Sequence, residues 1–193
     1  MYMGLNLAPR ERSVLELLGL QGDLVSDTLT ELSKSLLEGR SRLPRLRDLE
    51  RAGDEVAAEI RELARRTFPT SLGHEDVVAL ASALDDIIGL AGEAESRLER
   101  SRPGVVAEPA MTMGEYLAEA GTQLAAALEH LDGFEGLSER HAEIHRLASE
   151  GDRVAREALG DDARRELHDL LGRTLAECAH VADLLATIAV RNA

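Results

Sequence analysis

Apolar side chains recur at steps of three and four residues along almost the whole chain, which is the spacing of one face of an α-helix. No segment shows the alternation of apolar and polar residues that a half-buried β-strand requires. Turn-forming stretches break the helical pattern at 38–44, 68–76, 101–112, 132–136 and 159–163. We therefore predict an all-α fold, in which six helices joined by short turns pack as an antiparallel bundle.

Two segments far apart in the chain carry nearly the same pattern. Residues 49–60 read LERAGDEVAAEI and residues 147–158 read LASEGDRVAREA, and six of the twelve positions match. This shift of 98 residues also superposes the apolar positions of the second and fifth predicted helices. The third and sixth helices align at a shift of 87 residues, which places Ile88 over Leu175.

This similarity predicts a duplicated three-helix unit within one domain. The domain spans 1–193, with repeat one at about 8–101, a linker at 102–111 and repeat two at about 112–191. Each repeat keeps a glycine in its apolar seam, Gly53 or Gly151. Because glycine costs about 1 kcal/mol against alanine in a helix interior, we predict that another backbone approaches closely at both positions.

The core of such a bundle must be aliphatic, because the chain has only two Tyr, two Phe and no Trp. The net charge of −14 disfavours nucleic acid and anionic membranes, which need a basic surface, and favours cations or basic protein loops. Solubility alone also explains such a charge. The single cysteine, Cys178, excludes an intramolecular disulfide and is expected in the core. With no predicted signal peptide or membrane span, we expect a soluble, cytoplasmic protein.

Carboxylates beside the apolar seam are the main candidates for chemistry. Glu50 and Asp54 lie four residues apart and share one helix face. Asp85 interrupts a second apolar row on the following helix, where burial is costly unless the charge is paired or coordinated. Asp86 lies beside it and Glu93 follows two turns later. If the two helices pack together, these five side chains share one groove, which suits a hard cation or iron bound through oxygen.

Other interpretations of the polar residues stay open. An acidic helix face can be simply solvated, or paired with Arg47, Arg51 and Arg61. His141 and His145 have the i, i+4 spacing that can chelate a metal, although most such pairs on a polar helix face are solvated.

One Glu-x-x-His motif, Glu177 with His180, has no second copy, which argues against a ferritin-like di-iron centre. The chain has no G-x-S-x-G motif, no P-loop and no nucleophile spaced near a His–Asp pair. We therefore predict a protein that is not an enzyme.

Four segments in order resemble the PhoU-like family, and most closely the phosphate transport regulators encoded beside low-affinity inorganic phosphate transporters. They read LERAGDEVAAEI, HEDVVALASALDDIIGLAGEAE, IHRLASEGDRVAREAL and LLGRTLAECAHVADLLATI. The resemblance implies six helices in two repeats, with E-x-x-x-D motifs that bind metal clusters in some members. Glu50 and Asp54 match the first motif, and Asp85 and Asp86 match a following D-D-x-x-D whose last position is Gly89.

The second repeat departs further from the family pattern. Asp152 remains, its motif partner is replaced by Ala148, and Glu150 is the substitute we expect at a weaker second metal site. On the sixth helix, acidic positions of the family are taken by Gly172, Ala176, Ala179 and His180, while Asp183 persists.

Three functional hypotheses follow. The first is a non-enzymatic regulator or accessory protein of inorganic phosphate transport, which presents its acidic face to cytoplasmic loops of a phosphate transporter. It would lie at the inner face of the membrane through that transporter, with a divalent or ferric ion in the groove. The second is a metal-binding bundle for iron storage or redox chemistry that uses Glu50, Asp54, Asp85 and His180. The third is a structural homo-oligomer.

Overall fold

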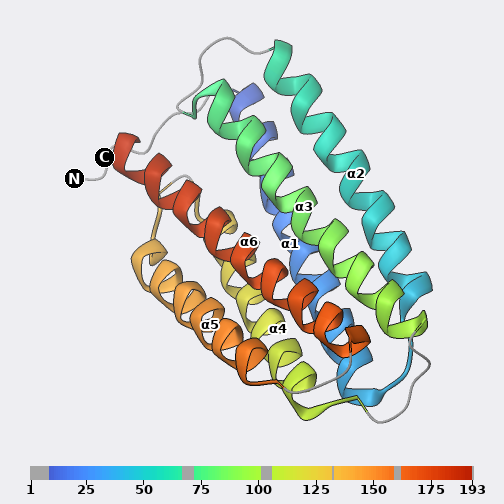
Figure 1. The fold of residues 1–193 in the computed structure, drawn as a ribbon. Coiled ribbons are helices and arrows are strands. Elements are labelled where there is room, and N and C mark those ends of the chain that lie inside the picture. The colour runs from blue at the N-terminus through green and yellow to red at the C-terminus, as the bar shows by residue number, and fades with distance from the viewer. Residues whose placement is uncertain (1–8, 67–71, 101–105, 132, 159–161, 193) are drawn as a thin grey trace.

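The computed structural model describes residues 9–66, 72–100, 106–131, 133–158 and 162–192. These residues form six α-helices and no strand: α1 Pro9–Glu38, α2 Leu43–Arg66, α3 His74–Arg100, α4 Glu108–Glu129, α5 Leu137–Glu157 and α6 Asp162–Asn192 (Figure 1). The prediction of an all-α helical bundle is confirmed.

The helices form two trios that meet along two lines of contact. Helices α1, α2 and α3 contact one another, and α4, α5 and α6 do the same. The trios join where α1 packs against α4 and where α3 packs against α6. In Figure 1 the helices α2, α3, α6 and α5 lie side by side in front, with α1 and α4 behind them. The outer surface formed by α2, α3 and α6 is therefore continuous.

The core is aliphatic, and the predicted apolar seams turn inward. Leu18, Leu84 and Leu117 are fully buried, as are seam residues on the other helices. Cys178 is fully buried as well, and this burial raises the pKa of its thiol to about 12. The thiol therefore stays protonated and behaves as a small core residue, as expected.

Helix α4 begins within the predicted linker at 102–111. Helix α4 begins at Glu108, so residues 108–111 are helical, while residues 101–105 lie outside the described part of the chain. Pro109 occupies the first turn of α4. Proline is tolerated there because its missing N–H would have no partner within the helix. Pro109, which lies in the predicted linker, is therefore at a helix start.

The seam glycines receive side chains, which corrects the prediction of a close backbone approach at Gly53 and Gly151. A Cβ atom added at Gly53 would lie 2.8 Å from Cδ1 of Ile88, and one at Gly151 would collide with Cδ1 of Leu175. The close backbone approach occurs between α1 and α4 instead. There, a Cβ at Gly121 would lie 3.1 Å from the Cα of Ser26.

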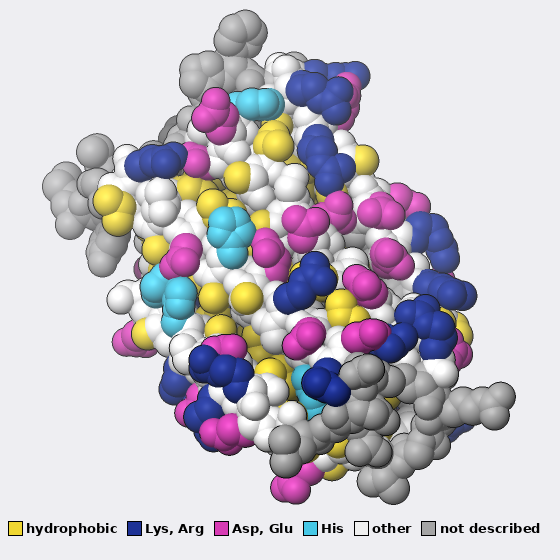
Figure 2. Space-filling view, in the orientation of Figure 1, with side chains coloured by type: hydrophobic (Ala, Val, Ile, Leu, Met, Phe, Trp, Pro, Cys, Tyr) yellow, Lys and Arg dark blue, Asp and Glu magenta, His cyan; other side chains and the backbone are white. Residues whose placement is uncertain are grey.

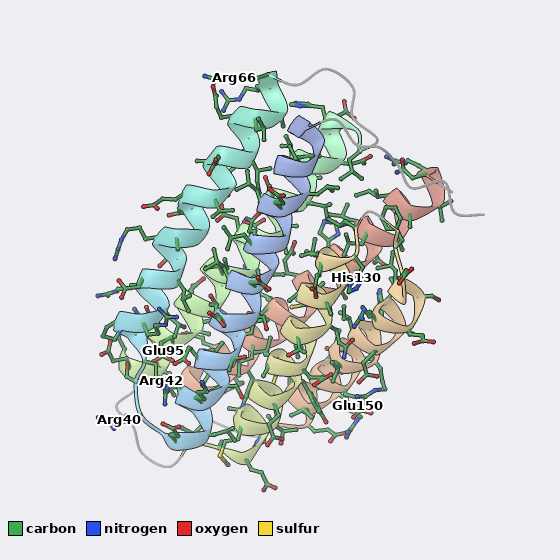
Figure 3. The ribbon with its side chains drawn as sticks, turned by 180° about the vertical axis from the view of Figure 1, so that it is seen from behind. Arg40, Arg42, Arg66, Glu95, His130 and Glu150 are labelled. Atoms are coloured by element: carbon green, nitrogen blue, oxygen red, sulfur yellow. The ribbon has the colours of Figure 1, made fainter. Side chains whose placement is uncertain are left out.

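A buried carboxylate on α3 fixes the start of α2. Glu95 is fully buried, and its Oε1 accepts hydrogen bonds from the backbone N–H of Arg42 at 2.7 Å and from the Ser41 hydroxyl at 3.0 Å (Figure 3). These bonds satisfy a backbone donor that α2 leaves free at its first turn. They also hold α2 against α3, which is where the predicted acidic residues meet.

Over the described ranges, no helix combines the length and the apolar character that crossing a membrane requires.

Candidate functional site

The predicted carboxylates line one groove where α2, α3 and α6 meet. This acidic groove has a volume of about 530 Å³. Its lining residues are Glu50, Asp54, Asp85, Asp86, Ile88, Gly89, Leu90, Glu93, Arg173 and Glu177. Figure 2 shows that acidic side chains gather on this face of the molecule, with basic side chains between them. The structure thus brings all five predicted acidic residues together and adds two residues from α6.

Local helix geometry explains how the acids reach the groove. Glu50 and Asp54 lie one turn apart on α2, on the exposed shoulder of its buried stripe. The Glu50 carboxylate lies beside Gly92 on α3, where a Cβ added to the glycine would lie 3.6 Å from Oε2 of Glu50, an ordinary contact distance. Asp85 lies in a row with the buried Ala81 and Ile88, and its side chain is 24% exposed.

Asp85 is the only one of the five predicted carboxylates with an ion pair among the described residues. Nη2 of Arg61 donates a hydrogen bond of 3.0 Å to Oδ2 of Asp85. Even so, the pKa of Asp85 is raised, because partial burial outweighs this bond and the nearby charges of Asp54 and Asp86 add repulsion. The ionised form of Asp85 is therefore disfavoured by its surroundings.

The other four predicted carboxylates make no ion pair within 4.0 Å in the described part of the chain. These are Glu50, Asp54, Asp86 and Glu93. Arg51 pairs with Asp48 on its own helix, at 2.7 Å, instead of with the groove. The alternative of an acidic face neutralised by arginines thus holds at Asp85 alone. The groove presents negative charge that is open to an external cation.

The groove contains the oxygen ligands that a hard cation prefers, but their oxygen atoms do not lie close to one common point. Over the residues described, one group alone brings three ligand atoms of His, Cys, Asp or Glu within 4.8 Å of one another, and it lies elsewhere. The groove carboxylates therefore lie apart from one another as these side chains are arranged.

The weaker acidic positions predicted in repeat two do not line the groove. Glu150 pairs with Arg153 at 3.1 Å and Asp152 pairs with Arg156 at 2.6 Å, all on α5. Glu150 lies at the outer edge of α5, away from α2 (Figure 3). These carboxylates are in surface ion pairs and the structure does not bring them together with the five groove residues.

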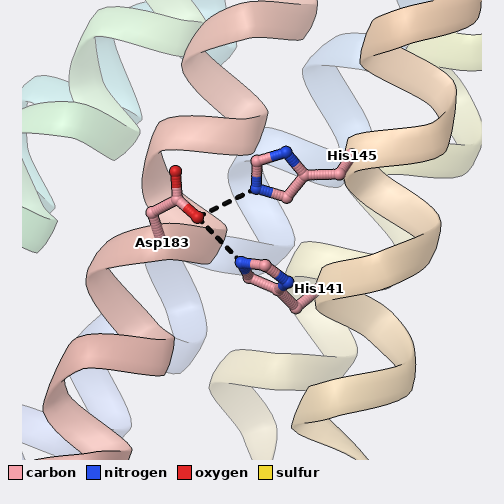
Figure 4. A group of neighbouring side chains, drawn as sticks. All are labelled: His141, His145 and Asp183. Atoms are coloured by element: carbon pink, nitrogen blue, oxygen red, sulfur yellow. Dashed lines mark hydrogen bonds and ion pairs between the residues drawn. The ribbon is translucent and has the colours of Figure 1, made fainter.

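The group of converging ligand atoms consists of His141 and His145 on α5 and Asp183 on α6 (Figure 4). Nε2 of His141 lies 2.7 Å and Nε2 of His145 lies 2.9 Å from the same atom, Oδ1 of Asp183. The pKa of Asp183 is lowered, chiefly by the hydrogen bond with His141. The histidine pair singled out by its spacing is therefore tied to an acid on the next helix.

Sequence reasoning missed three contributions from α6. Arg173 and Glu177 line the acidic groove, and Asp183 joins the histidine pair. The signal for Glu177 was its Glu-x-x-His spacing, but its partner His180 is exposed and does not line the groove. The set of Glu50, Asp54, Asp85 and His180, suggested for a storage or redox bundle, is therefore not assembled at this groove.

No protein-family model matches the chain, and no curated protein matches it.

Proposed function

We propose that this chain is a non-enzymatic regulatory or accessory protein of inorganic phosphate transport whose acidic groove binds a basic cytoplasmic loop of the transporter. The link to phosphate rests on the resemblance of four sequence segments to PhoU-like regulators. The binding role rests on the groove: four of its carboxylates have no ion pair among the described residues, in a cavity of about 530 Å³. That volume accommodates a few basic side chains of a loop.

The electrostatics favour a protein loop with several positive charges over a single metal ion. The carboxylates are spread over α2, α3 and α6 and do not converge on one point in the described residues. Lys and Arg side chains can each reach a different carboxylate, whereas a metal ion needs its ligands around one centre. Arg173 within the same groove offers a partner for an acidic residue of the loop.

A two-repeat, antiparallel arrangement of the bundle is part of this proposal. Two observations support it: the helices of each trio contact one another, and the two seam glycines pack against equivalent residues. Gly53 faces Ile88 and Gly151 faces Leu175, and each residue of the first pair aligns with its counterpart in the second at the shifts seen in the sequence. On this proposal, repeat one keeps the partner-binding groove and repeat two has lost it.

The groove is tested by a charge-reversal variant with a matched control. Glu50→Lys/Asp54→Lys changes two groove residues one turn apart. Glu55→Lys/Glu59→Lys makes the same change in net charge on exposed residues of α2, at the same spacing, outside the groove. Binding of a fluorescent Lys/Arg-rich loop peptide from the transporter is measured by anisotropy. We expect the groove variant to lose at least about tenfold in affinity and the control to change little.

Equal losses in both variants would mean that binding depends on overall charge and would overturn the groove as its site. The transport role is tested separately, by co-purification with the intact phosphate transporter and by phosphate uptake in cells that lack this chain. Unchanged uptake, together with failure to co-purify with a well-folded transporter, would remove the phosphate role.

Two alternatives are open to direct measurement. A storage or redox bundle predicts iron or manganese in protein purified without chelator, and near-zero content in elemental analysis would exclude it. A structural homo-oligomer predicts a mass above that of one chain, 20.9 kDa, in light scattering.

A further inference from the structure

Two histidines on one face of α5 are arranged as a chelating pair. His141 and His145 are one turn apart, and their ring centroids lie 4.4 Å apart with a tilt of 44° between the planes. The same i, i+4 spacing places two histidines on one metal in helical zinc sites. The pair thus supplies two of the ligands of a metal centre without any rearrangement of the helix.

A third ligand atom comes from the neighbouring helix. Asp183 on α6 directs Oδ1 at both rings, with Nε2 to Oδ1 distances of 2.7 Å for His141 and 2.9 Å for His145 (Figure 4). Within the described residues these histidines are the only ion-pair partners of Asp183. Both Nε2 atoms and the carboxylate oxygen therefore face one small volume between α5 and α6.

We propose that His141, His145 and Asp183 form a binding site for a divalent transition metal ion, with Zn²⁺ as the reference ion. Two imidazole nitrogens and one carboxylate oxygen are ligands that such ions accept, whereas Mg²⁺ and Ca²⁺ prefer oxygen alone. The side chains are 32%, 41% and 55% exposed, so water completes the coordination. This site is independent of the acidic groove and of the proposed function.

The distances fit a metal with a small adjustment. Zinc bonds of about 2.0–2.2 Å at tetrahedral angles separate a nitrogen ligand from an oxygen ligand by about 3.3 Å. The observed N···O distances of 2.7 and 2.9 Å must therefore open by about 0.5 Å as the metal replaces the shared protons. Rotation of three partly exposed side chains provides this without moving either helix.

A metal at this position ties α5 to α6. Because the ligands of the site come from two helices, the unfolded chain cannot present them together, and the ion stabilises the folded chain. Zn²⁺ is therefore expected to raise the melting temperature of the wild-type chain, and Mg²⁺ is not.

The test is isothermal titration of chelator-stripped, full-length protein with ZnCl₂, alongside His145→Ala and Asp183→Asn. His180→Ala is the matched control, because it removes an exposed histidine of α6 that is not part of the converging group. Glu50→Gln/Asp54→Asn is the second control and weakens only the groove. We expect one strong site in the wild type, a loss of at least about tenfold in both site variants, and no change in either control.

Circular dichroism of each variant checks that the helices remain folded. As a second readout, Co²⁺ at the site should give visible absorption bands that disappear in His145→Ala and persist in His180→Ala. Absence of Zn²⁺ binding by the wild type would overturn the proposal. Binding that survives in both site variants, or that is lost in the groove variant, would also overturn it.

Discussion

The helix pair α2–α3 and the helix pair α5–α6 each contain the same kind of packing contact, but the polar groups beside that contact differ. In the first, Gly53 receives Ile88, and carboxylates line an open groove. In the second, Gly151 receives Leu175, and two histidines and one aspartate converge on a single point. The apolar contact constrains both helix pairs in the same way, whereas the residues at its edge are free to differ.

This comparison shows that a large number of charged groups does not by itself bring their ligand atoms close to one point. The groove holds more carboxylates, but they are spread over three helices and one of them is bonded to Arg61. The smaller cluster brings three ligand atoms within 4.8 Å of one another. A dispersed set of charges suits an extended partner with several positive groups, and a convergent set suits a single ion.

The largest effects are expected where the two regions are alike. Gly53→Leu and Gly151→Leu should each lower the free energy of unfolding by about 1–3 kcal/mol, because a side chain there must displace Ile88 or Leu175. Asp54→Asn, on an exposed residue with no ion pair among those described, should change it by less than about 0.5 kcal/mol. Urea denaturation followed by circular dichroism measures all three.

If Gly53→Leu and Asp54→Asn denature at the same urea concentration, the space at Gly53 is not restricted. The contact between Gly53 and Ile88 then contributes nothing measurable to stability. A large loss at Gly151 alone would show that the two helix pairs are packed differently after all.

A smaller effect of opposite sign is expected at the groove wall. Gly89 is exposed within α3, and a Cβ added there would meet no atom within 4 Å. Gly89→Ala should therefore stabilise the chain by about 0.5–1 kcal/mol, through helix propensity alone. Ala176 occupies the matching position on α6 at the shift of 87 residues, so Ala176→Gly should cost a similar amount. Opposite signs in urea denaturation would confirm that helix propensity decides the effect at both exposed positions, and equal signs would contradict it.

Much of the groove followed from the sequence because its main walls are consecutive helices. The periodicity located α2 and α3, and it singled out Asp85 as a carboxylate that needs a partner if buried, which the structure shows to be Arg61. The contributions of α6 could not be predicted, because no pattern in one sequence gives the lateral order of helices that are distant in the chain. Asp183 lies 42 and 38 residues from its two histidines, and only the packing of α5 against α6 brings them together.

The atom that faces each seam glycine was equally hidden. Periodicity shows that Gly53 and Gly151 lie on the buried faces of their helices. It does not show what packs against them, because a glycine is needed both where a neighbouring backbone comes close and where the end of a neighbouring side chain does. The choice between them depends on the distance between helix axes, which composition does not encode.

The histidine–aspartate cluster should give a modest stability that depends on pH. In the metal-free chain, Asp183→Asn removes the charge that accepts from both imidazoles and should cost a few tenths of a kcal/mol. Because the pKa of folded Asp183 is lowered, this stability is present above the ordinary carboxyl pKa and is lost as the pH falls through the lowered value. Urea midpoints of wild type and variant should therefore differ at pH 6 and converge as the pH falls through the lowered pKa of Asp183. A constant difference would contradict an electrostatic origin.

The groove should show the opposite pH dependence. The raised pKa of Asp85 means that its charge opposes folding, and the stability linked to its protonated form is lost as the pH rises through that pKa. Asp85→Asn keeps an acceptor for Arg61 and removes the charge, so it should stabilise the chain by less than about 1 kcal/mol at pH 7. This gain should shrink as the pH falls through the raised pKa of Asp85, where the wild-type carboxylate becomes protonated.

Asp86→Asn, on an exposed neighbour without an ion pair in the described residues, provides the control for Asp85. It removes the same charge from the same groove but no buried carboxylate, so its effect should be smaller at pH 7. A lower urea midpoint for Asp85→Asn at pH 7 would show that attraction to Arg61 exceeds the cost of burial. In that case Asp85 would be a structural ion pair, and the binding capacity of the groove would rest on its exposed carboxylates alone.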